Sequence, residues 1–176
     1  MTSDLLAETA GELSWNVTDL AGTSLARGSK RVAIPARASG QAHELDLSEL
    51  LAKHGAANVL IWVALASGES VSRNLLTYAR PREMALNDPK LSFSVEGAGT
   101  EWSVTLTAAQ PALWVWLELA GREARFSDNF CHIQPGEPLQ IRVAIDQEMT
   151  REEFMKALSV RSLFDTYREA VGPVAE

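Results

Sequence analysis

The stretch Ala112–Pro138, ALWVWLELAGREARFSDNFCHIQPGEP, decides how the rest of the sequence is interpreted. Its first eight residues place Leu or Val at every second position, opposite a row that holds two tryptophans. This period of two is the alternation that a β-strand imposes on its side chains. Gly121 permits the next turn, and the run Ser127-Asp128-Asn129 has short polar side chains that hydrogen-bond to their own backbone. The stretch therefore predicts a β-meander with a loop structured by Ser127, Asp128 and Asn129.

Trp114 and Trp116 are the distinctive residues of this strand. If the Leu/Val row packs into a core, the two indoles lie on the opposite face, about 6.6 Å apart at two residues of strand rise. One interpretation is a stacking platform for a sugar ring, since an indole offers a flat apolar face and an N–H donor. The other is a surface covered by another domain, because large apolar patches are uncommon on free-standing domains. The covered surface is favoured, since tryptophan is enriched at protein interfaces.

The composition is that of a globular protein. The chain has 176 residues, of which 46% are hydrophobic and 22% charged, and its net charge is −7. This charge argues against a nucleic-acid partner, for which a basic stripe is expected. No apolar run approaches the length of a membrane helix, about 18 residues or more, and the N-terminus lacks the regions of a signal peptide. The sequence therefore predicts no membrane partner and specifies no compartment.

Short strands separated by turn residues run through the whole chain. The clearest are Asn58–Ala66, which is apolar on both faces, and Glu69–Tyr78 after a Ser-Gly turn; together they predict a hairpin. Only two short helical insertions are expected, at Ser48–His54 and after the capping box Thr150–Glu153. This pattern lacks the alternation of strands and helices that builds a parallel sheet. It predicts an all-β protein made of antiparallel sandwiches.

Glycines suggest further turns in both halves of the chain. Gly28 is expected to separate two short strands in the first half. Gly97-Ala98-Gly99 is expected to join two paired strands in the second half.

A domain boundary is expected between Pro81 and Pro89. The two prolines and an Asn-Asp pair interrupt the strand pattern there, because such residues break regular structure. We predict two tandem immunoglobulin-like β-sandwiches with short helical insertions. The first covers residues 1–80 and the second residues 91–167, with a packed linker at 81–90 and a loose tail at 168–176.

Nothing in these residues builds an active site. Glycoside hydrolysis needs two carboxylates about 5 to 10 Å apart in a cleft. The acidic residues nearest the tryptophans each have a plainer role at a strand end or in a turn: Glu118, Asp128 and Glu137. Cys131, the only cysteine, is expected to be buried and inert, because the adjacent His132 points to the other face of the strand. The histidines lack metal-ligand spacing, so we predict no catalytic residue, no metal site and no cofactor.

Several motifs resemble a known family. The run FSDNF at 126–130, followed by QPGEP at 134–138 and preceded by LNDP at 86–89, closely resembles the C-terminal end of β-mannosidases of glycoside hydrolase family 2. The earlier half, with WNVTDLAG at 15–22 and LDL at 45–47, is similar to the immunoglobulin-like module that precedes it in those enzymes. The resemblance covers most of the chain, about residues 13–167, and the FSDNF…PGEP combination is its most specific part.

The resemblance implies a parent enzyme that hydrolyses terminal β-D-mannosides. In that family a sugar-binding-like N-terminal domain and a TIM barrel come earlier, and both catalytic glutamates lie on the barrel. A barrel takes about 250 residues, so no catalytic residue is carried over to this chain, and catalysis by the chain itself is in doubt. The implied role is a non-catalytic accessory region that packs against the barrel and other domains of the parent through Trp114 and Trp116. The alternative is an autonomous carbohydrate-binding module that stacks a mannose-containing glycan on the same two residues.

Overall fold

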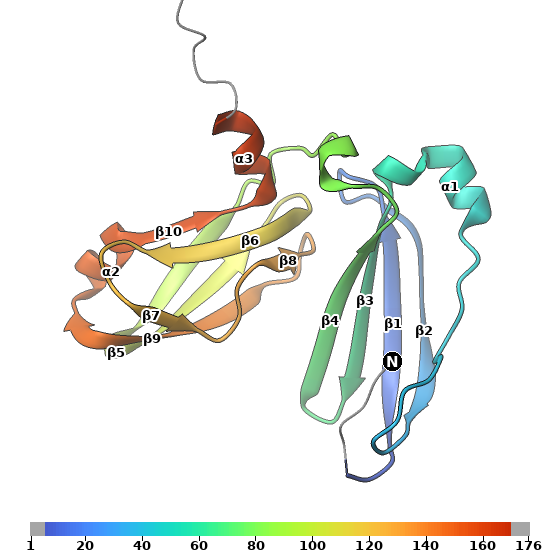
Figure 1. The fold of residues 1–176 in the computed structure, drawn as a ribbon, viewed down its shortest axis with the longest axis horizontal. Helices are drawn as coiled ribbons and strands as arrows, with labels where there is room; N and C mark the ends of the chain where they lie inside the picture. Colours follow the sequence, from blue (N-terminus) through green and yellow to red (C-terminus); the bar gives the residue numbers. More distant parts are fainter. Residues whose placement is uncertain (1–5, 170–176) are drawn as a thin grey trace, which may run out of the picture. The chain divides into compact units, whose positions relative to one another are not determined.

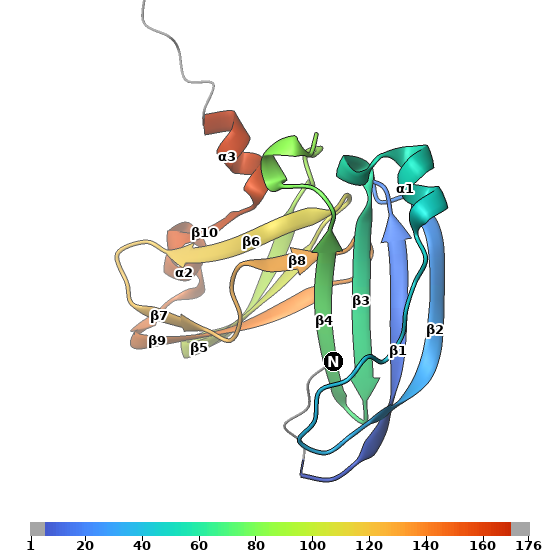
Figure 2. The same ribbon diagram turned by 45° about the vertical axis from the view of Figure 1, so that its right-hand side comes forward.

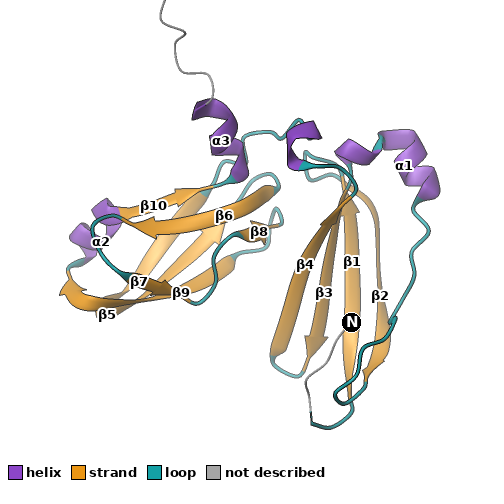
Figure 3. Cartoon of the chain, in the orientation of Figure 1, coloured by secondary structure: helices purple, strands orange, loops and turns teal. Residues whose placement is uncertain are grey.

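The computed structural model describes residues 6–169, which fold into two compact units (Figure 1). The first unit ends at Ala85 and the second begins at Leu86. Antiparallel strands dominate both units, as Figure 3 shows, and the all-β class is confirmed. Within residues 6–169, no helix has the length and apolar character needed to cross a membrane.

The first unit is built on one four-stranded antiparallel sheet with the strand order β2-β1-β3-β4. Figure 2 shows these strands side by side. They are β1 (Thr9–Thr18), β2 (Ser24–Ile34), β3 (Leu60–Ser67) and β4 (Ser70–Thr77). The predicted hairpin is confirmed, because β3 and β4 pair along their whole length and Gly68, with φ +58°, lies in the turn between them.

A helix and the segment before it cover one face of this sheet. Val17, Val59 and Ile61 are buried on that face together with Leu47. The helix α1 (Ser48–His54) follows Leu47, and the short helix η1 (Ala56–Asn58) leads into β3. Residues of the covering segment pack against the sheet through apolar side chains: Leu45, Leu50 and Leu51. On the described residues, the second layer of this unit is therefore helix and loop.

Gly28 lies inside β2, so the turn expected at this glycine is wrong. It pairs with Trp15 of β1, and a Cβ at position 28 would lie 2.5 Å from the Trp15 ring. The indole covers the glycine backbone, so glycine is required here by a close approach of a ring and not by a turn. The His43 ring lies against the same indole, with 4.7 Å between the ring centroids.

The second unit is a sandwich of two antiparallel sheets, with the strand orders β10-β6-β8 and β5-β9-β7. The first sheet holds β6 (Ala112–Leu119), β8 (Cys131–Ile133) and β10 (Leu158–Arg161). The second holds β5 (Ser92–Thr107), β7 (Ala124–Phe126) and β9 (Leu139–Met149). The helices α2 (Arg151–Ala157) and α3 (Leu163–Glu169) precede and follow β10.

The segment β5 is folded back on itself. The hydroxyl oxygens of Ser92 and Thr107, at its two ends, lie 2.7 Å apart, whereas a straight strand of this length would separate them by about 50 Å. Gly97 has φ +119°, and a Cβ there would lie 2.4 Å from the carbonyl oxygen of Glu101. The segment is therefore a hairpin, and the predicted turn at Gly97-Ala98-Gly99 is confirmed.

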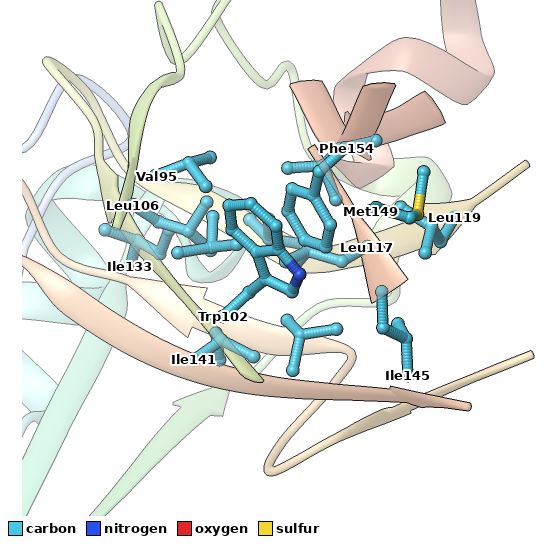
Figure 4. Packing of buried hydrophobic residues seen from close by; sticks show 14 of the residues in the cluster. Val95, Trp102, Leu106, Leu117, Leu119, Ile133, Ile141, Ile145, Met149 and Phe154 are labelled. Atoms are coloured by element: carbon cyan, nitrogen blue, oxygen red, sulfur yellow. The ribbon is translucent and has the colours of Figure 1, made fainter. Parts of the chain in front are cut away.

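The core of the second unit lies between its two sheets, and α2 closes one end of it (Figure 4). The rings of Trp102 and Phe154 stack in this core, with centroids 4.4 Å apart and planes inclined by 14°. The predicted capping box begins α2: Thr150 Oγ1 accepts from the Glu153 N–H at 3.3 Å, and Glu153 Oε2 accepts from the Thr150 N–H at 2.8 Å. The bonds that the Thr150 N–H and hydroxyl donate to the Glu153 carboxylate lower the pKa of Glu153. The cap places Phe154 where it meets Trp102.

The end of the first unit contains the short helix η2 (Pro81–Glu83). Met84 follows it and is buried. At the other end of the chain, Arg168 and Glu169 are the last residues of α3, so the loose tail predicted from residue 168 begins too early. The remainder of that tail, residues 170–176, lies outside the described residues.

Candidate functional site

The side chains of β6 alternate as the sequence predicts. The Leu/Val row is buried: Leu113, Val115, Leu117 and Leu119. Trp114 and Trp116 belong to the other row and are half-buried, and Glu118 beyond them is exposed. Both indoles therefore keep part of their surface outside the core of the second unit.

A β-bulge interrupts the pairing of β6 with β8 at Trp114. The register shifts between Ala112 and Val115, and Trp114 has φ +46°. This left-handed conformation costs a residue with a Cβ roughly 1–2 kcal/mol. The Trp114 N–H donates to Nδ1 of His132 at 3.2 Å, and the two rings meet edge to face with centroids 4.9 Å apart. The imidazole of His132 thus satisfies a backbone donor that the bulge takes out of the strand ladder.

Asn129 holds the next part of β6. Its Oδ1 accepts from the Leu117 N–H at 2.8 Å, and its Nδ2 donates to the Leu117 carbonyl at 3.0 Å. One side chain therefore pairs with both backbone groups of Leu117, as a residue of a neighbouring strand would. Phe130 follows with φ +57°, and its ring stacks on Trp116 with centroids 6.2 Å apart and planes inclined by 19°.

Trp114, Trp116, Phe130 and His132 form one surface feature, which we refer to as the aromatic row. Phe130 is its most open member, with 62% of its surface exposed. Arg161 of β10 pairs with Trp116 from the other side of β6, and α3 also contacts β6. The aromatic row thus runs across the outer face of the β10-β6-β8 sheet.

The loop at 127–129 bonds to both sheets of the sandwich. The Ser127 N–H donates to the Arg142 carbonyl at 2.8 Å, and Ser127 Oγ accepts from the Arg142 N–H at 3.0 Å. Arg142 belongs to β9, whereas Asn129 bonds to β6. Asp128 Oδ1 accepts from the Asn129 N–H at 2.8 Å. The loop therefore fixes the position from which Phe130 reaches Trp116.

The other chemically reactive groups near the aromatic row are three carboxylates and one thiol. Glu118, Asp128 and Glu137 are exposed side chains on a strand, in a loop and in a turn. The Cys131 thiol packs against the core, and its burial raises its pKa to about 11. The thiol is therefore protonated at neutral pH, and the thiolate is the nucleophilic form. Among residues 6–169, no cluster of His, Cys, Asp and Glu side chains is suited to hold a metal ion.

Two members of the aromatic row, Phe130 and His132, were not predicted as site residues. The signal for His132 lies in the sequence, because His132 alternates with Cys131 and Ile133 and so belongs to the outer face of β8. Phe130 directly precedes this strand and has φ +57°. What the sequence lacks is the pairing of β8 with β6, which brings these rings next to the two tryptophans.

The antiparallel strands of both units agree with a region of immunoglobulin-like domains. Residues 1–83 match the family model described as a mannosidase Ig/CBM-like domain, and residues 86–166 match a mannosidase model described as an Ig-fold domain. The chain belongs to the immunoglobulin-like region of the β-mannosidases, and the resemblance seen in the sequence is confirmed.

Relatives and solved structures also match most of this chain. The chain is 24% identical to β-mannosidase A of Aspergillus fumigatus over 94% of its own length, but it spans only 19% of that relative. The crystal structure of a β-D-mannosidase from Dictyoglomus thermophilum matches 92% of this chain and 19% of its own, with a TM-score of 0.73 and 21% identity. An exo-chitosanase of Amycolatopsis orientalis matches 92% of this chain and 24% of its own, with a TM-score of 0.58 and 13% identity. The structural likenesses show a common fold.

Proposed function

We propose that this chain is a non-catalytic accessory region of a larger β-mannosidase, and that it packs against the catalytic part of that enzyme through the aromatic row. One observation carries the proposal. The chain aligns over 94% of its length with a β-mannosidase while spanning 19% of that enzyme. A segment of this kind works beside the other domains of its parent.

The geometry of the aromatic row supports its assignment as the docking surface. Trp114 and Phe130 both have positive φ, and residues of this kind persist only where the surrounding structure fixes them. Asn129 and His132 supply that fixation through hydrogen bonds to β6. Large aromatic side chains held rigidly on a surface are typical of the centres of protein interfaces.

Replacing Trp114 and Trp116 together with serine is expected to destabilise the full-length parent by about 2 kcal/mol or more, the scale of an interface hot spot. The loss of stability in the parent should exceed the loss of stability that the same changes cause in the isolated chain, since only the parent contains the docking partner. Thermal melting of both forms measures this difference, and β-mannoside hydrolysis by the parent reports the effect on the catalytic part.

The matched control replaces Val71 and Leu76 with serine. These residues are also apolar and are 46% and 50% exposed, but they lie on β4 of the first unit and are not members of the aromatic row. We expect these two changes to alter the free energy of unfolding of the parent and of the isolated chain by less than about 1 kcal/mol. Unchanged melting and activity of the parent after the double tryptophan change would refute the docking role.

An autonomous carbohydrate-binding module is the second candidate. It is favoured by the stacked pair of Trp116 and Phe130, since an exposed aromatic ring can receive a sugar ring on its face. The ligand would be a mannose-containing glycan.

Titration of the isolated chain with manno-oligosaccharides, followed by tryptophan fluorescence, separates the two candidates. We expect no saturable change at millimolar sugar, because the Trp114 and Trp116 rings already contact His132 and Phe130. A saturable change that disappears when both tryptophans are replaced by serine would instead establish the binding module.

A further inference from the structure

The aromatic row is held by two side chains of different chemistry. Asn129 bonds to both backbone groups of Leu117 and has no titratable group. Nδ1 of His132 accepts from the N–H of Trp114, and an imidazole titrates near neutral pH. One end of the row is therefore fixed at any ordinary pH, whereas the other depends on the protonation of one ring.

The hydrogen bond to Trp114 requires neutral His132. A neutral imidazole has one accepting nitrogen and one N–H, so acceptance at Nδ1 places the proton on Nε2. In the protonated ring both nitrogens carry hydrogen, and Nδ1 becomes a donor that faces the donor of Trp114. The bond is then lost, and the left-handed conformation at Trp114 loses the support of this bond.

We propose that the aromatic row is a pH-sensitive surface. Neutral His132 holds the bulge at Trp114, and protonation of His132 releases this end of the row while Asn129 keeps Leu117 in place. The proposal concerns the shape of the row in the chain itself, so it stands whether the row docks a domain or binds a sugar.

The surroundings of His132 determine in which direction its pKa moves, and so how the stabilisation depends on pH. Burial disfavours the imidazolium and lowers the pKa of His132, and the negative charge of Asp128 acts in the opposite direction. Charged groups also lie on the neighbouring β6, β10 and α3 and in the turn after β8: Glu118, Arg161, Asp165 and Glu137. Because the pKa is lowered in the folded chain, the stabilisation is complete above the unfolded value of about 6.5. It is lost as the pH falls through the lowered pKa.

The test is an NMR titration of the ¹⁵N-labelled chain across the histidine range. Above the pKa, we expect the His132 ring to carry its proton on Nε2. As His132 titrates, the Trp114 amide resonance should move with the same midpoint, and its protection against hydrogen exchange should fall about tenfold, the factor equivalent to one net hydrogen bond. The Leu117 amide, which bonds to Asn129, should show neither change. The proposal would be overturned by a neutral ring protonated at Nδ1, or by a Trp114 amide whose resonance and exchange protection do not change as His132 titrates.

Two variants separate the acceptor from the charge. His132→Asn keeps an acceptor near the position of Nδ1 but does not titrate, so the Trp114 amide should stay protected at every pH. His132→Phe keeps an aromatic ring but has no acceptor, so the Trp114 amide should lack protection at every pH. If His132→Phe does not fold, the wild-type titration and His132→Asn still test whether His132 controls the Trp114 amide. A pH-dependent Trp114 amide in His132→Asn would show that another group controls the bulge.

Discussion

Replacement of Phe154 with alanine is expected to lower the free energy of unfolding of the second unit by about 3–5 kcal/mol. Phe154 has no exposed surface, and its ring stacks on Trp102 at 4.4 Å between the two sheets. Truncation removes the buried ring and leaves a cavity that Trp102 cannot fill without leaving its own contacts. The change also weakens the attachment of α2 to the sandwich, because Phe154 is the one buried residue of that helix.

Met155→Ala is the matched control for Phe154→Ala. Met155 is the next residue of the same helix and is 39% exposed, so its loss should change stability by less than about 0.5 kcal/mol. Urea unfolding of the chain, followed by NMR signals of the second unit, distinguishes this unit from the first. A loss below about 1 kcal/mol for Phe154→Ala would show that the core closes around the missing ring, contrary to the packing seen here.

The strand content of this fold was accessible from the sequence because strand alternation is a local signal. The row from Leu113 to Leu119 is buried at every second residue, and the hairpin of β3 and β4 lies where the pattern placed it. The capping box at Thr150 was equally readable, since it depends on two residues three positions apart. In each case the deciding partners are close in sequence or repeat at a fixed period.

The errors in the fold came from partners that are distant in sequence. Glycine is common in turns, but Gly28 lies within β2, where the indole of Trp15 on the paired strand covers its backbone. The layer over the first sheet likewise depends on where α1 packs, and the spacing of apolar residues in the sequence does not show this position. Such contacts are set by tertiary packing, so local propensity misses them.

The candidate site was predicted in part. The positions of Trp114 and Trp116 on the outer row of β6 follow from alternation alone. Their ring partners, Phe130 and His132, depend on the register between β6 and β8, and that register contains the bulge at Trp114. A bulge shifts the pairing by one residue, and no rule of spacing in the sequence places it.

Replacement of Asn129 with alanine is expected to destabilise the second unit by about 2–4 kcal/mol. The Asn129 side chain satisfies both the N–H and the carbonyl of Leu117, a residue with only 2% of its surface exposed. Each buried backbone group left without a partner costs about 1–3 kcal/mol. Asp128→Ala is the control, because Asp128 is exposed and its side chain accepts from the Asn129 N–H but bonds to neither backbone group of Leu117. Chemical unfolding of both variants measures the difference, and equal losses would contradict the special role of Asn129.

The variant Asn129→Asp tests the two hydrogen bonds separately. A carboxylate still accepts from the Leu117 N–H, but it has no hydrogen to donate to the Leu117 carbonyl, and two acceptors then face each other. The pKa of the introduced carboxyl should therefore be raised in the folded chain, and stability should recover as the pH falls and the protonated carboxyl becomes a donor. The Trp116–Phe130 contact should return with it, because Asn129 places Phe130 on Trp116. Recovery of stability without recovery of this contact would mean that the loop holds the sandwich together but does not position the aromatic row.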